Sequence, residues 1–229
     1  MHLKSFGCSF IYGCDLPDED YSNCSQLSWP ALLAQSCELD YSCYAKPGSG
    51  NLQILHSVLN ELATSDTTDF FVIGWTWVDR FDYYDPENNN KFGTPWSTIV
   101  PNNDSALAKT YYQELHSELS DKFTCLSYIQ LAITMLKQKN IPFIMTYLDE
   151  LVFDQQWNTT PAILELQALT KPYMTQFNDK TFLEWSREQG HPESTTWHPL
   201  EEAHRAATDY MRQIFDRKNT SVLVPQALS

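Results

Sequence analysis

Two side chains at opposite ends of the chain could together carry out nucleophilic chemistry. Ser9 follows the apolar run His2–Phe6 and then Gly7, so its hydroxyl is predicted to be exposed on a tight turn between a strand and a helix. His198 precedes Pro199, which suits the first turn of a helix. An imidazole at a helix entrance can reach across a cleft and act as a general base for a serine nucleophile.

Three further positions could stabilise a developing oxyanion together with the backbone N–H of Ser9. Gly48 stands in a glycine-containing segment that also holds Asn51, and Thr76 follows an apolar run. Glycine lets the backbone approach a ligand, while an amide or hydroxyl side chain can donate a hydrogen bond to negative charge. For Asn51 the competing interpretation is an N-cap of the following helix.

The elements that must position these residues alternate between strands and helices. Apolar runs predict strands at His2–Phe6, Leu39–Ala45, Asp69–Trp75 and Ile141–Leu148. Helices are predicted at Trp29–Ser36, Asn51–Thr64, Pro161–Thr170, Thr181–Gln189 and from Pro199 to about Asp216, with one or two more within Ser105–Lys139. This alternation predicts a parallel α/β sheet, whose site lies at the carboxyl ends of the strands.

The 229 residues are interpreted as one domain with an insertion and a tail. Residues 79–104 lack a helical period and predict a long surface loop, rich in aromatic residues that make disorder less favourable: Tyr83, Tyr84, Phe92 and Trp96. A short tail with a β-like segment is predicted from residue 219 onward.

Charge and composition exclude several classes of protein. The formal net charge is −14, which argues against nucleic acid and against anionic membranes as partners. No apolar stretch is long enough for a transmembrane helix and the N-terminus does not read as a secretory signal, so a cytoplasmic protein is expected. The six cysteines are expected to be reduced thiols.

No cofactor and no metal ion is expected. His191, His198, Glu202 and His204 could be combined into a metal site, but their spacing matches no established ligand pattern. His204 is instead expected to be a structural or surface residue of the last helix.

Taken in order, these segments resemble the SGNH (GDSL-type) hydrolase family from residue 3 to about 211. The run Phe6-Gly7-Cys8-Ser9-Phe10-Ile11-Tyr12-Gly13 resembles the first block, with Cys8 where an aspartate is usual; Gly48 with Asn51 nearby resembles the second block, and His198-Pro199 the last. The resemblance implies a three-layer α/β/α, flavodoxin-like fold with a mostly parallel sheet. It also implies that Ser9 is the nucleophile, that the Ser9 and Gly48 amides are oxyanion donors, and that His198 is the base.

Two blocks depart from the family pattern. The third block, usually Gly-x-Asn-Asp, reads Gly74-Trp75-Thr76-Trp77, so Thr76 stands at the asparagine position, with Arg80 as a candidate to assist it. Thr195 stands where the last block has its acid. The partner of His198 is left open among Glu193, Asp149, Glu150 and a backbone carbonyl.

The resemblance predicts an esterase that removes an O-acetyl or similar acyl group from a carbohydrate or other polar substrate through a Ser-His acyl-enzyme mechanism. The aromatic insertion favours a sugar, because flat rings stack on aromatic faces. The alternatives are a glycan O-acyltransferase with the same site, and a catalytically weak glycan-binding protein. The expected partner is therefore a small-molecule or glycan ester.

Overall fold

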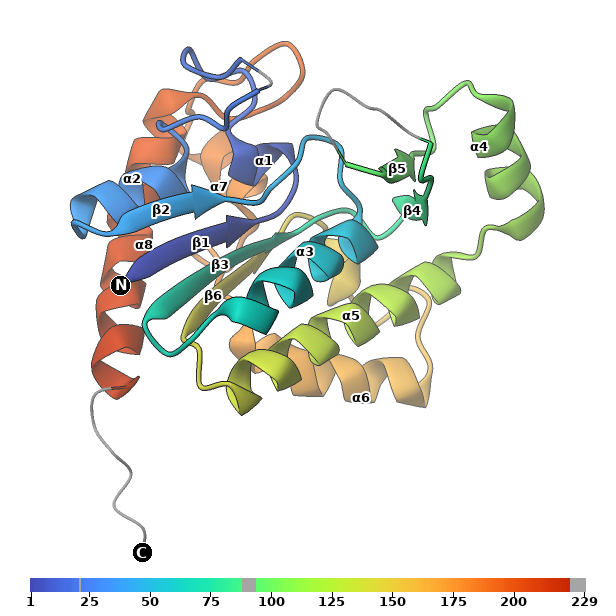
Figure 1. Cartoon of the computed structure of the whole chain (residues 1–229). Coiled ribbons are helices and arrows are strands. Elements are labelled where there is room, and N and C mark those ends of the chain that lie inside the picture. The colour runs from blue at the N-terminus through green and yellow to red at the C-terminus, as the bar shows by residue number, and fades with distance from the viewer. Residues whose placement is uncertain (21, 88–93, 223–229) are drawn as a thin grey trace, which may run out of the picture.

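The core of the molecule is a four-stranded parallel sheet, seen in a computed structural model that describes residues 1–20, 22–87 and 94–222. The strands are β1 (His2–Phe6), β2 (Asp40–Cys43), β3 (Asp69–Trp75) and β6 (Phe143–Tyr147), in the order β2-β1-β3-β6 (Figure 1). All four predicted strands are confirmed. β1 and β3 have the predicted bounds, whereas β2 and β6 are shorter than predicted.

Helices cover both faces of this sheet, so the predicted three-layer α/β/α architecture is confirmed (Figure 1). Along β3, Phe71 and Ile73 point into one core, while Phe70 and Val72 point into the other. This alternation is the two-residue period of a strand with both faces buried. The first face packs against α3 (Asn51–Thr64), α5 (Glu118–Gln138) and α6 (Pro161–Thr170), and the second against α1 (Ser9–Tyr12), α2 (Trp29–Ser36), α7 (Phe182–Glu188) and α8 (Glu201–Val222).

The insertion at residues 79–104 is not the loop that its composition predicted. It contains β4 (Phe81–Tyr84) and β5 (Trp96–Ile99), which form an antiparallel ribbon. The buried carboxylate of Asp82 anchors the ribbon by accepting hydrogen bonds from the N–H groups of Gly50 and Gln53 at the start of α3, each at 2.9 Å. Phe92 lies outside the described residues.

Two helical regions also differ from the expectation. The segment predicted as one or two helices divides into α4 (Ala106–Thr110), the π-helix η1 (Tyr111–Leu115) and α5. Single-turn 3₁₀ helices η2 (Glu150–Val152) and η3 (Lys171–Tyr173) follow later in the chain. The last helix continues through Val222, so the predicted tail begins within a helix, and residues 223–229 lie outside the described part.

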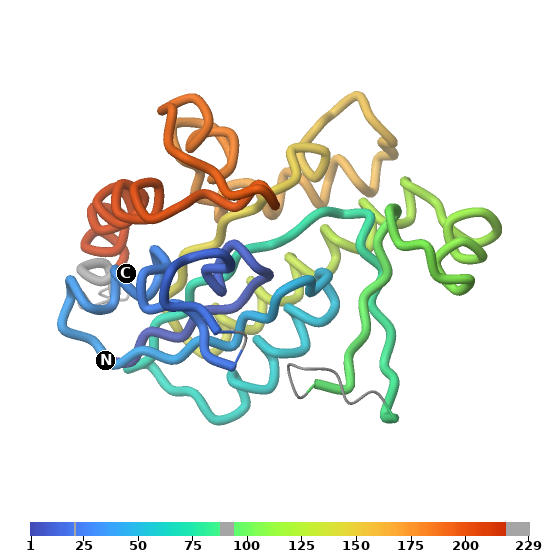
Figure 2. The backbone as a smooth tube through the Cα atoms, turned by 90° about the horizontal axis from the view of Figure 1, so that it is seen from above, coloured from blue at the N-terminus to red at the C-terminus, as the bar shows by residue number. Residues whose placement is uncertain are grey.

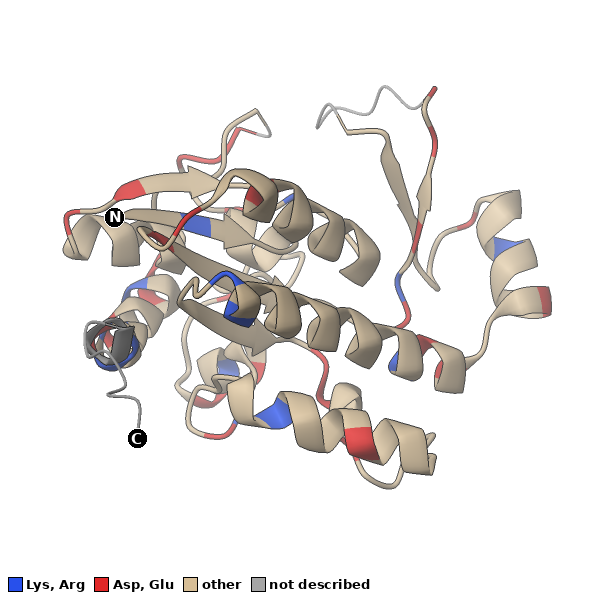
Figure 3. Cartoon of the chain, turned by 60° about the horizontal axis from the view of Figure 1, so that its bottom comes forward, with Lys and Arg blue, Asp and Glu red and all other residues tan. Residues whose placement is uncertain are grey.

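The surface carries the acidic excess on many elements rather than in one block (Figure 3). Within the described residues, no helix combines the length and apolar character needed to cross a membrane. All six cysteines are free thiols.

Candidate active site

The turn that carries Ser9 is shaped by Gly7, at the carboxyl end of β1. A Cβ atom on Gly7 would lie 2.5 Å from Ile11 Cγ1 and 3.0 Å from the carbonyl oxygen of Gly74. Any larger residue would therefore push the turn away from the end of β3. This close approach places Ser9, the first residue of α1, in the lining of a cleft at the carboxyl edge of the sheet.

The cleft has a volume of about 720 Å³, which lies in the usual range for small-molecule sites. Its lining brings together the segments that follow β1, β2, β3 and β5, a residue of α7 and the loop before α8: Ser9, Phe10, Cys14, Asp15, Pro47, Gly48, Trp77, Asp79, Arg80, Val100, Pro101, Asn102, Leu183, Thr196, Trp197 and His198. Ser9, Gly48 and His198 thus line one cleft at the carboxyl ends of the strands, which is where a parallel α/β sheet is expected to place its site.

His198 has a carboxylate partner near the other end of the chain. Its Nδ1 lies 2.7 Å from Oδ2 of Asp15, which follows the left-handed Gly13 turn that ends α1. Figure 2 shows the chain just before α8 running beside the N-terminal segment. The other imidazole nitrogen, Nε2, is left to act as a base, because a carboxylate at Nδ1 requires the proton to be on that nitrogen.

The loop before His198 holds the Asp15 carboxylate in place with hydroxyl groups. Ser194 Oγ donates to Asp15 Oδ2 at 2.7 Å, and Thr196 Oγ1 also donates to this oxygen. Burial alone would raise the pKa of this carboxyl. The hydrogen bonds from Thr196, Ser194 and His198 outweigh burial and lower the pKa of Asp15 to about 2, so it is ionised at neutral pH.

The acids considered from the sequence have other partners. Glu193 forms a two-point ion pair with Arg187, at 2.8 and 3.1 Å. Asp149 accepts hydrogen bonds from the backbone N–H groups of Val78 and Leu151, and Glu150 interacts with Glu184. Thr195, at the position of the family acid, is exposed.

Asp15 is the site residue that sequence reasoning missed. It lies 183 positions from His198, and three other acids follow it at Asp18, Glu19 and Asp20, so composition does not single it out. The available signal was its position directly after Gly13-Cys14, where a chain leaving a short helix needs a left-handed turn. Asp15 itself adopts a φ of 66°, a region that aspartate tolerates better than most residues.

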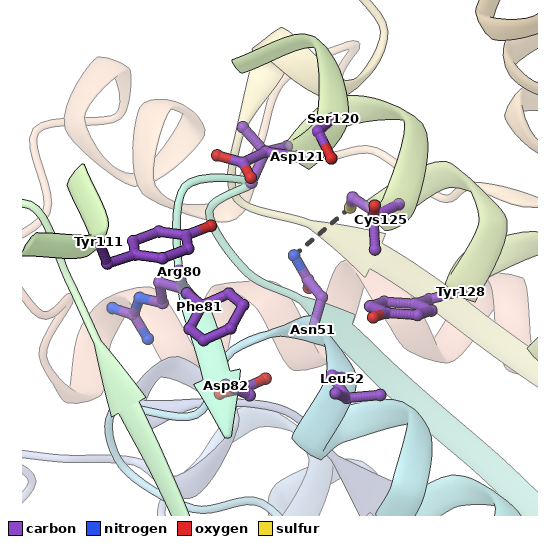
Figure 4. A pocket seen from close by; sticks show the side chains of 12 residues that line it. Asn51, Leu52, Arg80, Phe81, Asp82, Tyr111, Ser120, Asp121, Cys125 and Tyr128 are labelled. Carbon is purple, nitrogen blue, oxygen red and sulfur yellow. Dashed lines mark hydrogen bonds between the residues drawn. The ribbon is translucent and has the colours of Figure 1, made fainter. Parts of the chain in front are cut away.

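Two predicted oxyanion donors do not lie in the lining of the cleft. The Asn51 side chain accepts from the Thr76 N–H at 2.9 Å and donates to the carbonyl groups of Thr76 and Trp77. It also contacts the sulfur of Cys125, beside a separate cavity of about 130 Å³ (Figure 4). The Thr76 hydroxyl is buried without a hydrogen-bond partner among the described residues. Asn51 is thus hydrogen-bonded to the end of β3 and the Thr76 hydroxyl is buried, so neither side chain faces the cleft, and the oxyanion role of each stays a prediction.

The backbone amides of Ser9 and Gly48 are placed differently. Neither N–H has an acceptor in the part of the chain that the structure describes. A Cβ on Gly48 would meet nothing within 4 Å, so the backbone there faces open space, with a φ of 81° that favours glycine. These two amides can point donors into the cleft without competition from the protein.

Aromatic and cationic groups complete the site. Phe10 packs edge-on against the His198 ring, with ring centroids 5.1 Å apart, and also against Trp77 at 5.6 Å. The guanidinium of Arg80 lies 4.7 Å from the centroid of the Trp77 ring and donates to the carbonyl of Ser49 at 2.9 Å. Phe10 thereby restricts the orientation of the imidazole, and Trp77 packs behind Phe10.

Comparison with known proteins finds similarity in structure alone. No protein-family model and no curated protein sequence matches the chain. Among solved structures, a member of the lipolytic protein G-D-S-L family from Veillonella parvula is 15% identical with a TM-score of 0.51, covering 95% of this chain and 99% of that one. The chain has the SGNH-hydrolase fold.

Two other solved structures support the same fold. The psychrotrophic esterase EstA from Pseudoalteromonas sp. is 9% identical with a TM-score of 0.52, over 94% of this chain and 97% of that chain. A carbohydrate esterase family 2 enzyme with a carbohydrate-binding domain, from Corynascus thermopiles (Myceliophthora fergusii), is 14% identical with a TM-score of 0.53, over 96% of this chain and 66% of that one.

Within this SGNH fold, two other histidines close to His198 in the sequence pack in the interior or against an aromatic ring. His204 is buried, and its Nδ1 accepts the backbone N–H of Trp29 at 3.0 Å. Burial lowers the pKa of His204 to about 3, so the ring stays neutral. This confirms the structural role expected for His204. The His191 ring packs against Trp185, and the described residues contain no group of three or more metal-ligating side chains.

Proposed function

We propose that the protein is a serine esterase in which Ser9, His198 and Asp15 form the catalytic triad. The observation that carries this proposal is the His198–Asp15 pair, at 2.7 Å, in the lining of the same cleft as Ser9. The SGNH fold supports it, because solved structures with this fold include a lipolytic protein and two esterases.

In the first step, Ser9 Oγ attacks the ester carbonyl carbon while His198 Nε2 takes the hydroxyl proton. Asp15 stabilises the resulting imidazolium through the bond at Nδ1. The tetrahedral intermediate carries its negative charge on the former carbonyl oxygen, where the N–H groups of Ser9 and Gly48 donate to it. Collapse of the intermediate breaks the ester bond, and His198 returns the proton to the leaving alcohol.

In the second step, water hydrolyses the acyl-enzyme. His198 removes a proton from the water molecule, the resulting hydroxide attacks the acyl carbon, and the same two amides stabilise the second oxyanion. The proton then passes from His198 to Ser9 Oγ as the carboxylic acid leaves. The enzyme is regenerated without a cofactor.

The proposed substrate is a neutral carbohydrate or similar polar molecule that carries an O-acetyl or other short acyl group. Indole rings, Arg80 and Asp79 in the lining suit the apolar face and the hydroxyl groups of a sugar. The net charge of −14 disfavours polyanionic substrates. The carbohydrate esterase with the same fold supports this choice of class.

The test is reaction with a fluorophosphonate, which modifies an activated serine, together with hydrolysis of 4-nitrophenyl acetate. The parent and a Ser127→Ala control on α5 should be labelled with one probe per chain, whereas Ser9→Ala should be neither labelled nor active. Equal labelling or hydrolysis by Ser9→Ala would refute the assignment.

The two alternatives can be separated from this proposal by further measurements. A catalytically weak binder was suggested by the missing acid and asparagine. The Asp15 contact removes the first of these grounds, and a binder would leave the fluorophosphonate unreacted. An acyltransferase would use the same residues, and analysis of products with a sugar acceptor present would detect acyl transfer.

A further inference from the structure

Trp197 is the most exposed large apolar side chain at the cleft, and its backbone is strained. The residue is 70% exposed and has a φ of 65°, in the left-handed region that bulky side chains rarely adopt. No aromatic partner of its indole is found among the described residues, in contrast to Trp77. Folding therefore gains little from this side chain, which points to a role in binding.

The loop around Trp197 fixes the backbone that carries the indole relative to His198 and Asp15. Ser194 N–H donates to the His198 carbonyl at 2.9 Å, and Trp197 N–H donates to the Ser194 carbonyl at 3.1 Å. His198 N–H donates to Ser194 Oγ at 3.1 Å. Because Ser194 also binds Asp15, one tight turn joins the backbone of Trp197, His198 and the carboxylate of Asp15.

The chemistry of the surroundings indicates what the indole contacts. A flat, exposed indole offers an apolar face to the C–H groups of a pyranose ring, while Arg80, Asp79 and Asn102 in the same lining offer donors and acceptors for hydroxyl groups. The cleft of about 720 Å³ has room for a sugar beyond the acetyl group itself.

We propose that Trp197 is a specificity-determining residue that stacks on a sugar ring of the substrate and thereby presents its ester to Ser9. This proposal rests on the esterase function proposed above. It replaces the original reason for expecting a sugar, because the aromatic residues of the β4–β5 ribbon contact one another: Tyr84 packs against Trp96 with ring centroids 5.5 Å apart.

The deciding variant is Trp197→Asn, because asparagine tolerates the left-handed backbone and removes the indole without adding strain. The matched control is Tyr84→Thr, which removes a 58% exposed aromatic side chain from the β4–β5 ribbon and keeps a residue suited to a strand. Each variant is assayed on acetylated xylo-oligosaccharides and on 4-nitrophenyl acetate, which has no sugar. Thermal unfolding is recorded in parallel.

Trp197→Asn should raise KM for the acetylated oligosaccharide, so that kcat/KM falls about tenfold more for this substrate than for 4-nitrophenyl acetate. Its unfolding temperature should not fall, and Tyr84→Thr should behave as the parent on both esters.

Equal losses on the two esters would mean that Trp197 positions His198 instead, and an unchanged KM would exclude stacking. Failure of the parent to cleave the acetylated oligosaccharide while it cleaves 4-nitrophenyl acetate would overturn the sugar proposal alone. Failure of the parent on both esters would overturn the esterase function, and with it the substrate role of Trp197.

Discussion

Replacing Asp15 by asparagine tests the proposed triad most directly. The substitution keeps the size of the side chain and removes its charge. Asp15 Oδ2 now accepts from His198 Nδ1, Ser194 Oγ and Thr196 Oγ1, and all three donors are suited to a carboxylate. An asparagine can either turn its carbonyl oxygen to His198, which weakens the bond, or turn its NH₂ group, which imposes the wrong imidazole tautomer.

The expected loss of activity follows from these two outcomes. A hydrogen bond to a charged group contributes about 1.5–3 kcal/mol, or roughly 10- to 200-fold in rate. The wrong tautomer costs about 10⁴-fold in a well-studied serine protease. We therefore expect Asp15→Asn to lower kcat on 4-nitrophenyl acetate by about 10- to 10⁴-fold with little change in KM.

The same substitution has an effect on stability with a defined pH dependence. The pKa of Asp15 falls from 3.8 to about 2 on folding, so its contribution is complete above pH 3.8 and is lost as the pH falls through 2. Linkage gives at most about 2.4 kcal/mol. Because 32% of the side chain is exposed, solvent screening reduces the expectation to about 1 kcal/mol.

The assay combines steady-state kinetics at pH 7 with urea unfolding at several pH values. Glu193→Gln is the matched control, since this acid is close to His198 in the sequence but binds Arg187. The control should retain parental kcat. A fall of less than threefold in kcat for Asp15→Asn, or an equal fall in both variants, would refute the role assigned to Asp15.

Three further predictions concern the residues around the site. Gly7→Ala should lower the free energy of unfolding by about 1–3 kcal/mol and abolish hydrolysis, because its Cβ would lie 2.5 Å from Ile11; parental activity in the purified variant would contradict the role of this turn. His204→Leu should lower the free energy of unfolding by about 1–3 kcal/mol at pH 7, because it leaves the Trp29 N–H unpaired. In the unfolded chain His204 binds a proton below pH 6.5, whereas the folded ring binds one only near pH 3. The free energy of unfolding of the parent should therefore decrease as the pH is lowered from 6.5 to 3, and that of the variant should decrease less. Identical pH slopes of the two proteins would argue against a neutral buried ring. Asn51→Ala should lower stability by about 1–3 kcal/mol, measured by urea unfolding, and a 10³-fold loss of kcat without loss of stability would instead restore it as an oxyanion donor.

Local patterns predicted the sheet, and contacts between distant segments decided the site. The uninterrupted apolar run Asp69–Trp75 gave the central strand with its correct bounds, because burial on both faces leaves a clear signal. The β4–β5 ribbon was missed, since its anchor is one buried carboxylate, Asp82, received by the start of α3. A charged residue in a polar segment gives no sign of such burial.

The candidate site, like the sheet, was predicted only where a local pattern in the sequence gives a signal. Ser9, Gly48 and His198 were predicted from local signals, a turn or a nearby helix start, and all three lie in the cleft lining. The role of Asp15 depends on its contact with His198, which is 183 positions away. The Asn51 side chain is held by hydrogen bonds to the backbone that follows β3. Neither relation can be seen in the spacing of residues along the chain.

Because the carboxylate comes from residue 15, the segment just before His198 does not have to supply both the partner of the imidazole and the aromatic residue proposed to contact the substrate. The oxygen that binds His198 Nδ1 comes from a residue after α1, and the four residues before His198 contain hydroxyls and an indole but no acid. That segment can therefore change at position 197 without removing the charge on which the imidazole depends. Libraries that vary residue 197 alone, with Asp15, Ser194 and Thr196 held fixed, are consequently a rational starting point for altering substrate preference in this protein.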